Sequence, residues 1–171
     1  MHERTGEAFE LDEQLTVTGR KLPVGAAAPE FELDWLDDKG AIGQVRLADS
    51  AGSVRLLNVI NSIDTPVCHV ETLAWQQRLA AAGPSVRIYT ISMDLPFALE
   101  RWRVAQGVEH QLLSSHRSEQ FGLDYGVGIA EWRLLQRAVF VIDAQDRIAH
   151  AEYVADQMRE PDYEAALAAI G

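Results

Sequence analysis

The sequence predicts an α/β protein in which helices cover a mixed central β-sheet. The run 56–60 in "VRLLNVINS" is almost continuously apolar, which is typical of a strand buried on both faces. Strand-like and helix-like patterns alternate up to residue 126, and a hairpin pattern with a final helix follows. Helical crossovers favour parallel strands and a hairpin favours antiparallel ones, so both pairings are expected in one sheet. The length of 171 residues suits one domain with a single core.

The N-terminal part is expected to be rich in β-structure. The first residues are polar and acidic, so we expect a flexible N-terminus over 1–13 and a folded domain over 14–171. Short alternating stretches on either side of a Gly-Arg-Lys turn predict a β-hairpin within 14–25. A further strand is predicted over 31–36, and a second short β segment is expected after the Asp-Asp-Lys-Gly turn at 37–40.

The middle of the chain alternates between helices and strands. Apolar residues spaced three and four apart over 65–82 predict a helix, which Gly83 and Pro84 would end. The β-branched run 86–93 predicts the next strand. The stretch "DLPFALERWRVAQG" combines an aspartate cap, an early proline and a terminal glycine, and therefore predicts a short helix that begins at Asp94.

The last third of the chain is expected to complete the sheet. We expect a strand over 110–115, a short helix over 118–126 and a loop at "YGVGIAEW", residues 125–132. The segment 137–154 predicts a hairpin with an Asp-Ala-Gln-Asp turn. The closing helix, 160–170, has an early proline and acidic residues in its first turn.

Charge and composition exclude several classes of protein. With 15 Lys and Arg against 26 Asp and Glu, the net charge is -11, which disfavours nucleic acids and anionic membrane surfaces as partners. No apolar run approaches the roughly 20 residues that span a bilayer. The histidines lack metal-ligand spacing and no glycine-rich nucleotide motif occurs, so neither a metal nor another cofactor is expected.

The chain has one cysteine, which argues against a disulfide-stapled secreted domain. The N-terminal stretch "MHERTGEAFELDEQ" also lacks the pattern of a signal peptide. We therefore expect a cytoplasmic location.

The cysteine, Cys68, stands in "NSIDTPVCHV", directly after the predicted central strand. A helix that starts near Thr65 would place Cys68 in its first turn, where unpaired backbone N–H groups and the helix dipole favour an anion. A thiol so placed can have a pKa well below about 8.5, and its thiolate is a nucleophile. The hydroxyl of Thr65 could cap the helix or donate to a substrate. A buried, inert thiol fits the same spacing, so both interpretations stay open at this point.

Four ordered segments carry a family resemblance: "SIDTPVC", "ISMDLPFALERW", "LLQRAVFVID" and "EPDYEAALAAI". Together they resemble the thiol peroxidase branch of the peroxiredoxins, over about residues 15–170. The resemblance implies a thioredoxin-like fold with an N-terminal β-hairpin and a peroxide substrate. It also implies that Cys68 attacks the peroxide and becomes a sulfenic acid. Thr65 would hydrogen-bond the peroxide, and Arg137 would stabilise the thiolate and polarise the O–O bond.

The chain departs from that family at two positions. Asn61 stands where the family motif has a proline, and Arg103 stands where the family has a resolving cysteine. An internal disulfide is impossible with one cysteine. The resemblance therefore predicts a one-cysteine peroxidase for hydrogen peroxide or small alkyl hydroperoxides. Its sulfenic acid would be reduced by an external thiol, either thioredoxin or a low-molecular-weight thiol, unless two chains pair through Cys68. A homodimer is expected.

Two other functions fit the same residues. The protein could be a binding or signalling protein that is oxidised once at Cys68 and reports this to a partner. It could also be a silent scaffold with a buried thiol. His69 could depress the pKa of its neighbour, although adjacent helical residues point to different faces. Trp102 and Trp132 are candidates for lining a pocket or a dimer face.

Overall fold

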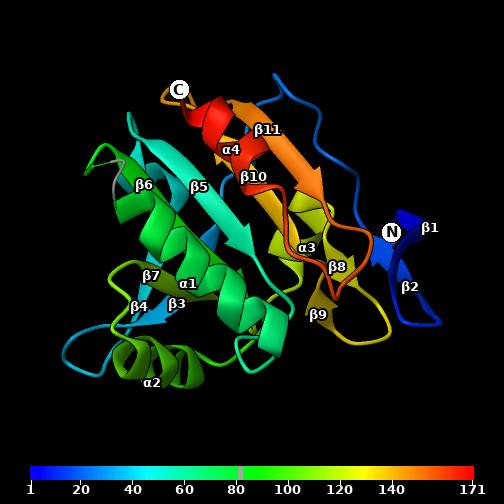
Figure 1. The fold of residues 1–171 in the computed structure, drawn as a ribbon, viewed down its shortest axis with the longest axis horizontal. Coiled ribbons are helices and arrows are strands. Elements are labelled where there is room, and N and C mark those ends of the chain that lie inside the picture. Colours follow the sequence, from blue (N-terminus) through cyan, green and yellow to red (C-terminus); the bar gives the residue numbers. More distant parts are fainter. Residues whose placement is uncertain (81–82) are drawn as a thin grey trace.

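A computed structural model describes residues 1–80 and 83–171 of the chain (Figure 1). The predicted end of the helix over 65–82 falls partly on residues outside this description. The elements, in chain order, are β1 (Glu3–Glu10), β2 (Glu13–Thr18), β3 (Glu32–Leu36), β4 (Ile42–Arg46), the 3-10 helix η1 (Leu47–Ser50), β5 (Val54–Val59), α1 (Pro66–Ala80), β6 (Val86–Ser92), α2 (Pro96–Gln106), β7 (Gln111–Ser114), α3 (Gln120–Tyr125), β8 (Gly128–Ile129), β9 (Leu134–Leu135), β10 (Ala138–Ile142), β11 (Ile148–Tyr153) and α4 (Tyr163–Ile170).

The central sheet is mixed, which confirms the prediction. Its strand order is β11-β10-β5-β6-β7-β3-β4. Strands β5, β6 and β7 run parallel to one another, whereas β10 pairs antiparallel with both β5 and β11. Strand β5 lies inside this sheet, between β10 and β6, and is buried along nearly its whole length. A central strand covered on both faces needs apolar residues at successive positions, which explains the run that marked it in the sequence.

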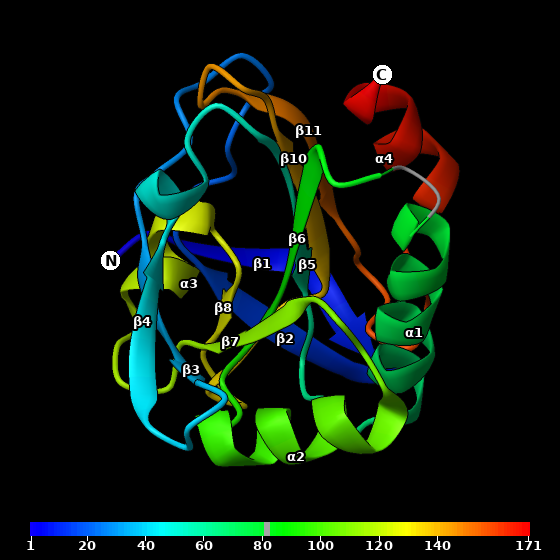
Figure 2. The same ribbon diagram turned by 90° about the vertical axis from the view of Figure 1, so that its left-hand side faces the viewer.

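Helices pack on both faces of the sheet, and each face has its own apolar cluster. Figure 2 shows α1 and α4 on one side of β5, β6 and β10, and α3 on the other side. On the α1 side, the fully buried Trp75 lies in one cluster with Leu56 and Val139. On the opposite side, Leu57 and Phe140 belong to a larger cluster that includes the aromatic residues of α3. Alternating residues of β5 therefore anchor both layers.

The N-terminal hairpin exists, but it lies earlier in the chain than predicted. The prediction placed both strands within 14–25 and treated 1–13 as a flexible N-terminus. The structure instead pairs β1 antiparallel with β2. β1 is polar along most of its length, so its sequence carried little apolar alternation to indicate a strand. In β2, Leu15 and Val17 are buried on one face, which is the pattern that the prediction detected.

Two glycines let the hairpin dock against the end of α3. Gly19 and Gly126 have φ angles of 89° and 68°, in the left-handed region. A Cβ atom on Gly19 would lie 2.2 Å from the carbonyl oxygen of Leu123, and one on Gly126 would lie 2.3 Å from that of Arg20. The two backbones thus approach too closely for any side chain. This contact brings β2 beside β8 and positions the β8–β9 segment near Cys68.

Three other segments differ from the prediction. Residues 125–132, predicted as a loop, contain β8, which pairs with β2 and β9. Asp94 does not cap α2, because the N-cap residue is Leu95 and no side chain caps this helix. The carboxylate of Asp94 bonds to the β5–α1 loop instead. Helix α4 starts at Tyr163, later than expected, with Asp162 as its N-cap.

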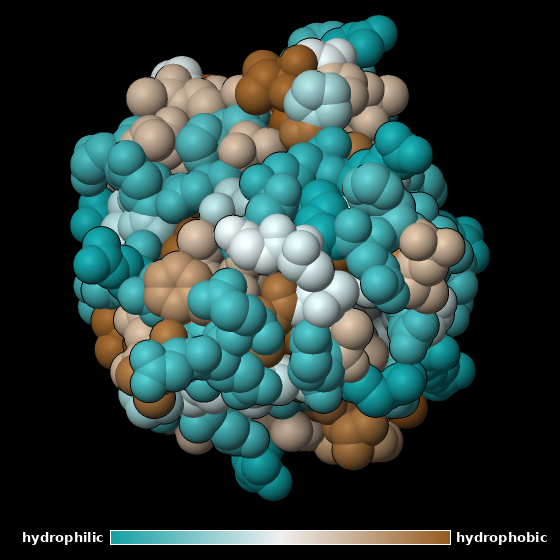
Figure 3. Space-filling view, turned by 90° about the vertical axis from the view of Figure 1, so that its right-hand side faces the viewer, coloured by the Kyte–Doolittle hydropathy of each residue, from teal (hydrophilic) through white to brown (hydrophobic). Residues whose placement is uncertain are grey.

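The face that carries the N-terminal hairpin, β8 and β9 is mostly hydrophilic, and its apolar residues form small separate patches (Figure 3). Within the described ranges, no helix combines the length and the apolar composition that a membrane crossing requires.

The glycine contact predicts a difference between two chemically identical substitutions. Gly107 and Gly126 both end a helix with positive φ, 65° and 68°. A Cβ atom meets no other atom within 4 Å at Gly107 but clashes with backbone at Gly126. We expect Gly107→Ala to lower the free energy of unfolding by about 1 kcal/mol. Gly126→Ala should lower the free energy of unfolding by roughly a further 1–3 kcal/mol, because of the backbone clash. Urea denaturation measures both, and equal losses would contradict the close docking of the hairpin.

Candidate active site

The loop between β5 and α1 carries Asn61 and Thr65, and Asp94 holds it in place. The Asp94 carboxylate accepts a hydrogen bond of 2.8 Å from the Ser62 hydroxyl and another of 2.8 Å from the backbone N–H of Ile63. Asp94 follows β6, the parallel neighbour of β5. The loop is therefore tied to the adjacent strand at the carboxyl end of the sheet, where ligands gather in α/β folds.

Cys68 lies in the first turn of α1, where the sequence predicted it. Its thiol is free and its exposed fraction is 0%. The unpaired N–H groups and the dipole of this 15-residue helix favour a negative charge at that end. The sulfur is otherwise surrounded by an apolar cluster, whose buried members are Ile60, Ile63, Leu99, Val108 and Leu112.

Thr65 comes directly before α1 and lines a cavity beside the helix start. Its hydroxyl donates a hydrogen bond of 2.8 Å to the main-chain oxygen of Ser62. The hydroxyl proton is therefore engaged within the loop, and the oxygen lone pairs remain to accept a hydrogen bond from a ligand. The Thr65 carbonyl accepts from the N–H of His69 at 3.0 Å, which closes the first turn of the helix.

Arg137 lies just before β10 and is 1% exposed. Its Nη1 donates a hydrogen bond to the carboxyl group of Glu71 in α1. Its Nη2 donates to the main-chain oxygen of Gln157 at 2.7 Å and to Oδ1 of Asn61 at 3.3 Å. Within the described part of the chain, the Nε–H group finds no acceptor of good hydrogen-bond geometry. Three residues, Asn61, Glu71 and Gln157, thus meet at one guanidinium group.

The Arg137 guanidinium lies next to Cys68 and stays charged. Burial acts to lower the pKa of Arg137, but the neighbouring acidic groups of Glu71 and Cys68 outweigh burial and raise it. A guanidinium group keeps its proton under all ordinary conditions. The structure therefore brings the predicted residues Cys68 and Arg137 together, with Thr65 at the rim of the adjacent cavity.

Glu71 is a buried acid that the sequence analysis did not single out. Its burial is the main cause that raises its pKa to about 8, and the charge of Arg137 opposes that shift. One buried cation thus faces two acidic groups, the Glu71 carboxyl and the Cys68 thiol. When Glu71 keeps its proton, the positive charge of Arg137 is left to stabilise a negative charge on the sulfur.

A cavity of about 310 Å³ opens beside the start of α1. Arg137 and Gln157 lie at its polar side, and Trp132, Leu134 and Met158 supply apolar surface. The remaining lining residues are Glu10, Asn61, Thr65, Pro66 and Val67. The cavity therefore combines a charged donor with apolar surface, which suits a small amphipathic ligand.

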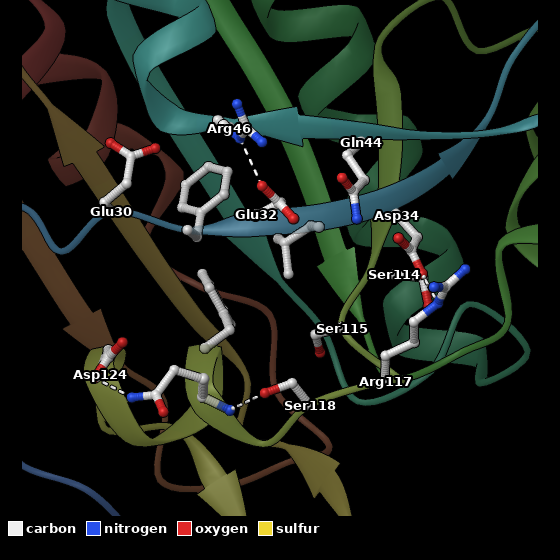
Figure 4. Close-up of a pocket in the computed structure, with 14 residues that line it drawn as sticks. Glu30, Glu32, Asp34, Gln44, Arg46, Ser114, Ser115, Arg117, Ser118 and Asp124 are labelled. Carbon is white, nitrogen blue, oxygen red and sulfur yellow. Dashed lines mark hydrogen bonds and ion pairs between the residues drawn. The ribbon is translucent and has the colours of Figure 1, made fainter.

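A larger hollow of about 480 Å³ lies elsewhere, between β3, β4 and α3 (Figure 4). None of its lining residues belongs to the group around Cys68. Its charged side chains are partly paired with one another: Arg46 bonds Glu32 at 2.6 Å and Arg117 lies 2.6 Å from Asp34. Both arginines that line this hollow are thus paired with carboxylates.

His69 points away from the sulfur and packs against α2. The indole N–H of Trp102 donates to Nδ1 of His69 at 3.0 Å, and the two rings meet edge to face. Arg103, at the position of the family's resolving cysteine, forms a two-point contact with Glu100 and donates to the Val108 carbonyl at 2.9 Å. Trp132 lines the cavity, whereas Trp102 packs on the cluster that contains Cys68.

Sequence reasoning missed Glu71 and Gln157, and it assigned Asp94 to a helix cap. The sequence shows a glutamate three residues after the cysteine. It does not show that this glutamate is buried against Arg137, because that depends on the folded structure. Gln157 lies in a loop 20 residues after Arg137. The described residues contain no group of three or more side chains arranged to hold a metal ion.

Comparisons with known proteins agree with this geometry. The family model for the AhpC/TSA family matches residues 24–151. The chain is 42% identical to a thiol peroxidase of Streptococcus sanguinis, over 94% of this chain and 96% of that protein. It is also 42% identical to a thiol peroxidase of Bacillus subtilis, over 88% and 87%.

Solved structures give the same result. A peroxiredoxin-like protein from Aquifex aeolicus superimposes with a TM-score of 0.81 at 28% identity, covering 99% of this chain and 98% of that chain. A thiol peroxidase from Chromobacterium violaceum superimposes with a TM-score of 0.82 at 25% identity, covering 94% and 93%.

Fold and comparisons together define the class, a thioredoxin-like oxidoreductase of the peroxiredoxin type. The chain belongs to the AhpC/TSA family, within its thiol peroxidase branch. The predicted fold class and family are thereby confirmed.

The raised pKa of Glu71 predicts how stability depends on pH. Its carboxyl titrates near 8 in the folded chain, against 4.5 as the ordinary value. The folded state therefore holds a proton that the unfolded state releases, and the free energy of unfolding falls as pH rises from 5 through 8. Each unit of pKa difference is worth about 1.4 kcal/mol. Glu71→Gln should remove this part of the slope, whereas the exposed control Glu164→Gln should keep it. Chemical denaturation at several pH values tests this, and an unchanged slope in Glu71→Gln would contradict a protonated Glu71.

Proposed function

We propose that this thiol peroxidase works with one cysteine, Cys68, whose sulfenic acid is reduced by an external thiol. The observation that carries the proposal is the arrangement at the start of α1, where the fully buried Cys68 and the buried Arg137 guanidinium lie close enough for their charges to interact. Family membership supports peroxide as the substrate. The lone cysteine of the chain supports the one-cysteine cycle.

The first step is attack of the Cys68 thiolate on one oxygen of a hydroperoxide. An S–O bond forms while the O–O bond breaks. The sulfur is oxidised to a sulfenic acid, and the departing oxygen takes up a proton and leaves as water or an alcohol. Negative charge grows on that leaving oxygen, so a preorganised donor directed at it lowers the barrier.

Arg137 and Thr65 have separate roles in this step. The guanidinium stabilises the thiolate and then the negative charge of the breaking O–O bond, because it stays charged and its orientation is held by three partners. The Thr65 hydroxyl already donates to Ser62, so it would accept the hydrogen bond of the hydroperoxide O–H group. This assigns Thr65 as an acceptor, where the sequence analysis had assigned a donor.

The second step regenerates the thiol. An external thiol attacks the sulfenic sulfur, water leaves and a mixed disulfide forms. A second thiol then attacks the outer sulfur and releases Cys68 as a thiolate. In sum, one hydroperoxide and two thiols give an alcohol, water and a disulfide. Arg103, engaged by Glu100 and Val108, offers no sulfur for an internal route.

Hydrogen peroxide and small alkyl hydroperoxides both fit the cavity. The apolar side chains of Trp132, Leu134 and Met158 would contact an alkyl group while the peroxide end faces Arg137. Burial of such a group is worth about 0.8 kcal/mol for each CH₂. The cavity therefore favours short alkyl hydroperoxides over hydrogen peroxide in binding.

The proposal includes a homodimer and a cytoplasmic location. Leu95 and Phe97 at the start of α2 are 52% and 54% exposed, and an interface would cover such apolar side chains. A cytoplasmic location supplies the reduced thiols that each cycle consumes.

One observation favours a second candidate function, a redox signal that is recycled slowly. Cys68 is fully buried, and the contact between His69 and Trp102 holds its helical turn against α2. A reductant reaches the sulfur only after this turn moves. A protein of this kind would be oxidised quickly and reduced slowly.

The decisive experiment follows peroxide consumption by purified protein with either thioredoxin or glutathione as reductant. We expect repeated turnover in the native chain and none in Cys68→Ser, because the thiolate supplies the electrons. Mass spectrometry during turnover should detect a mixed disulfide at Cys68. One rapid oxidation without turnover by any thiol would favour the signalling role. Absence of any oxidation would contradict both.

A further inference from the structure

Asn61 is the residue that differs from the family motif, and it lies within the core of the site. It follows β5 and is 4% exposed. Its Nδ2 donates to the carbonyl of Leu135 at 2.6 Å and to Oε1 of Gln157 at 3.0 Å. Its Oδ1 accepts from Nη2 of Arg137 at 3.3 Å. A buried amide with partners at both ends has one orientation only, so its oxygen must face the arginine.

Gln157 completes this arrangement. Its Oε1 accepts from both the Asn61 amide and the backbone N–H of Arg137, the latter at 2.8 Å. Its own amide nitrogen donates to the carbonyls of Val154 and Ala155. Asn61 and Gln157 therefore form a closed network of two amides. This network holds both the backbone and the guanidinium of Arg137.

The hydrogen bonds of the Arg137 guanidinium determine where its remaining N–H groups point. Glu71 engages Nη1, and Asn61 with the Gln157 carbonyl engages Nη2. The guanidinium is planar, so these contacts on its two terminal nitrogens also set the direction of Nε–H. The N–H groups left for Cys68 and its substrate, which are Nε–H and the second N–H of Nη1, are thus held in place before any peroxide arrives. A proline at this position has no amide and could provide none of the contacts of the Asn61 side chain.

We propose that Asn61 is a positioning residue for peroxide reduction, which orients the Arg137 guanidinium toward Cys68 through the Asn61–Gln157 network. This inference rests on the proposed role of Arg137. Asn61 replaces the proline of the family motif. In this chain the asparagine does not impair the site, because it helps to position Arg137. It also follows that restoring the family's proline lowers activity here.

The test compares three variants: Asn61→Leu, Asn61→Pro and Asn58→Leu. Asn58 is a matched control, because it is a buried amide of β5, the strand directly before Asn61, and it donates to Thr72 and Thr90 and not to Arg137. Stopped-flow measurement of Cys68 oxidation gives the second-order rate constant with tert-butyl hydroperoxide. We expect this rate constant to fall by about 10- to 100-fold in both Asn61 variants, because a misplaced catalytic group costs about that much. In Asn58→Leu the rate constant should stay within about threefold of the native value.

Alkylation by iodoacetamide separates orientation from a general loss of structure. This reagent reports the thiolate and its accessibility but has no O–O bond for Arg137 to polarise. The peroxide rate should therefore fall more than the alkylation rate in both Asn61 variants. Equal falls in the two rates would show a structural role and overturn the proposal. Two different Asn61 substitutions guard against one that fails to fold.

A double-mutant cycle with Arg137→Ala shows whether Asn61 acts through the arginine. If it does, Asn61→Leu slows the native chain but causes no further loss of peroxide rate in the Arg137→Ala background. Additive losses would overturn the proposal. The same cycle tests the proposed function separately, because an unchanged rate in Arg137→Ala alone would contradict the role of the arginine itself.

Discussion

The buried guanidinium of Arg137 is the interaction on which the site depends. It is 1% exposed, and a charge so far from water persists only when its donors are met by acceptors. Those acceptors come from the first helix through Glu71, from the β5–α1 loop through Asn61 and from the segment after β11 through Gln157. The cation therefore connects the β5–α1 loop and the first helix to the segment after β11, which is distant in sequence. It also lies next to Cys68, in the first turn of α1.

The charge balance around Arg137 explains how a buried thiol can react. The single cation faces two acidic groups, and burial keeps the proton on Glu71 up to a pH of about 8. The positive charge of Arg137 and the positive end of α1 both lie beside Cys68. In the proposed cycle, Thr65 and the cavity at the start of α1 contact the hydroperoxide. The proposed external thiol then has to displace the His69–Trp102 contact to reach the buried sulfur.

Much of the fold was predictable because its signals are local. The apolar run of β5, the helical spacing of α1 and the β10–β11 hairpin each depend on residues close together in the chain. The β1–β2 hairpin was misplaced because β1 is polar, and its pairing depends on a docking contact between Gly19 and α3. Asp94 was misassigned for a similar reason. Its partners, Ser62 and Ile63, lie more than thirty residues earlier in sequence and meet it only in the folded chain.

The residues of the candidate site also differ in how far the sequence could predict them. Cys68, Thr65 and Arg137 were found from motif resemblance, and the structure brings them to one place. Glu71 and Gln157 could not be found, because a glutamate on a helix and a glutamine in a loop become informative only when Arg137 lies between them. Asn61 was recognised as a departure from the motif, but its meaning depended on the direction of its amide.

The most direct test of this account is the ¹⁵N–¹H NMR signal of Arg137 Nε in the reduced protein. If the free donor of the buried guanidinium faces the Cys68 thiolate, this N–H should exchange slowly with water. Its chemical shift should also change clearly in Cys68→Ala. An Nε–H signal that exchanges rapidly, and that is the same in the native chain and in Cys68→Ala, would contradict the account.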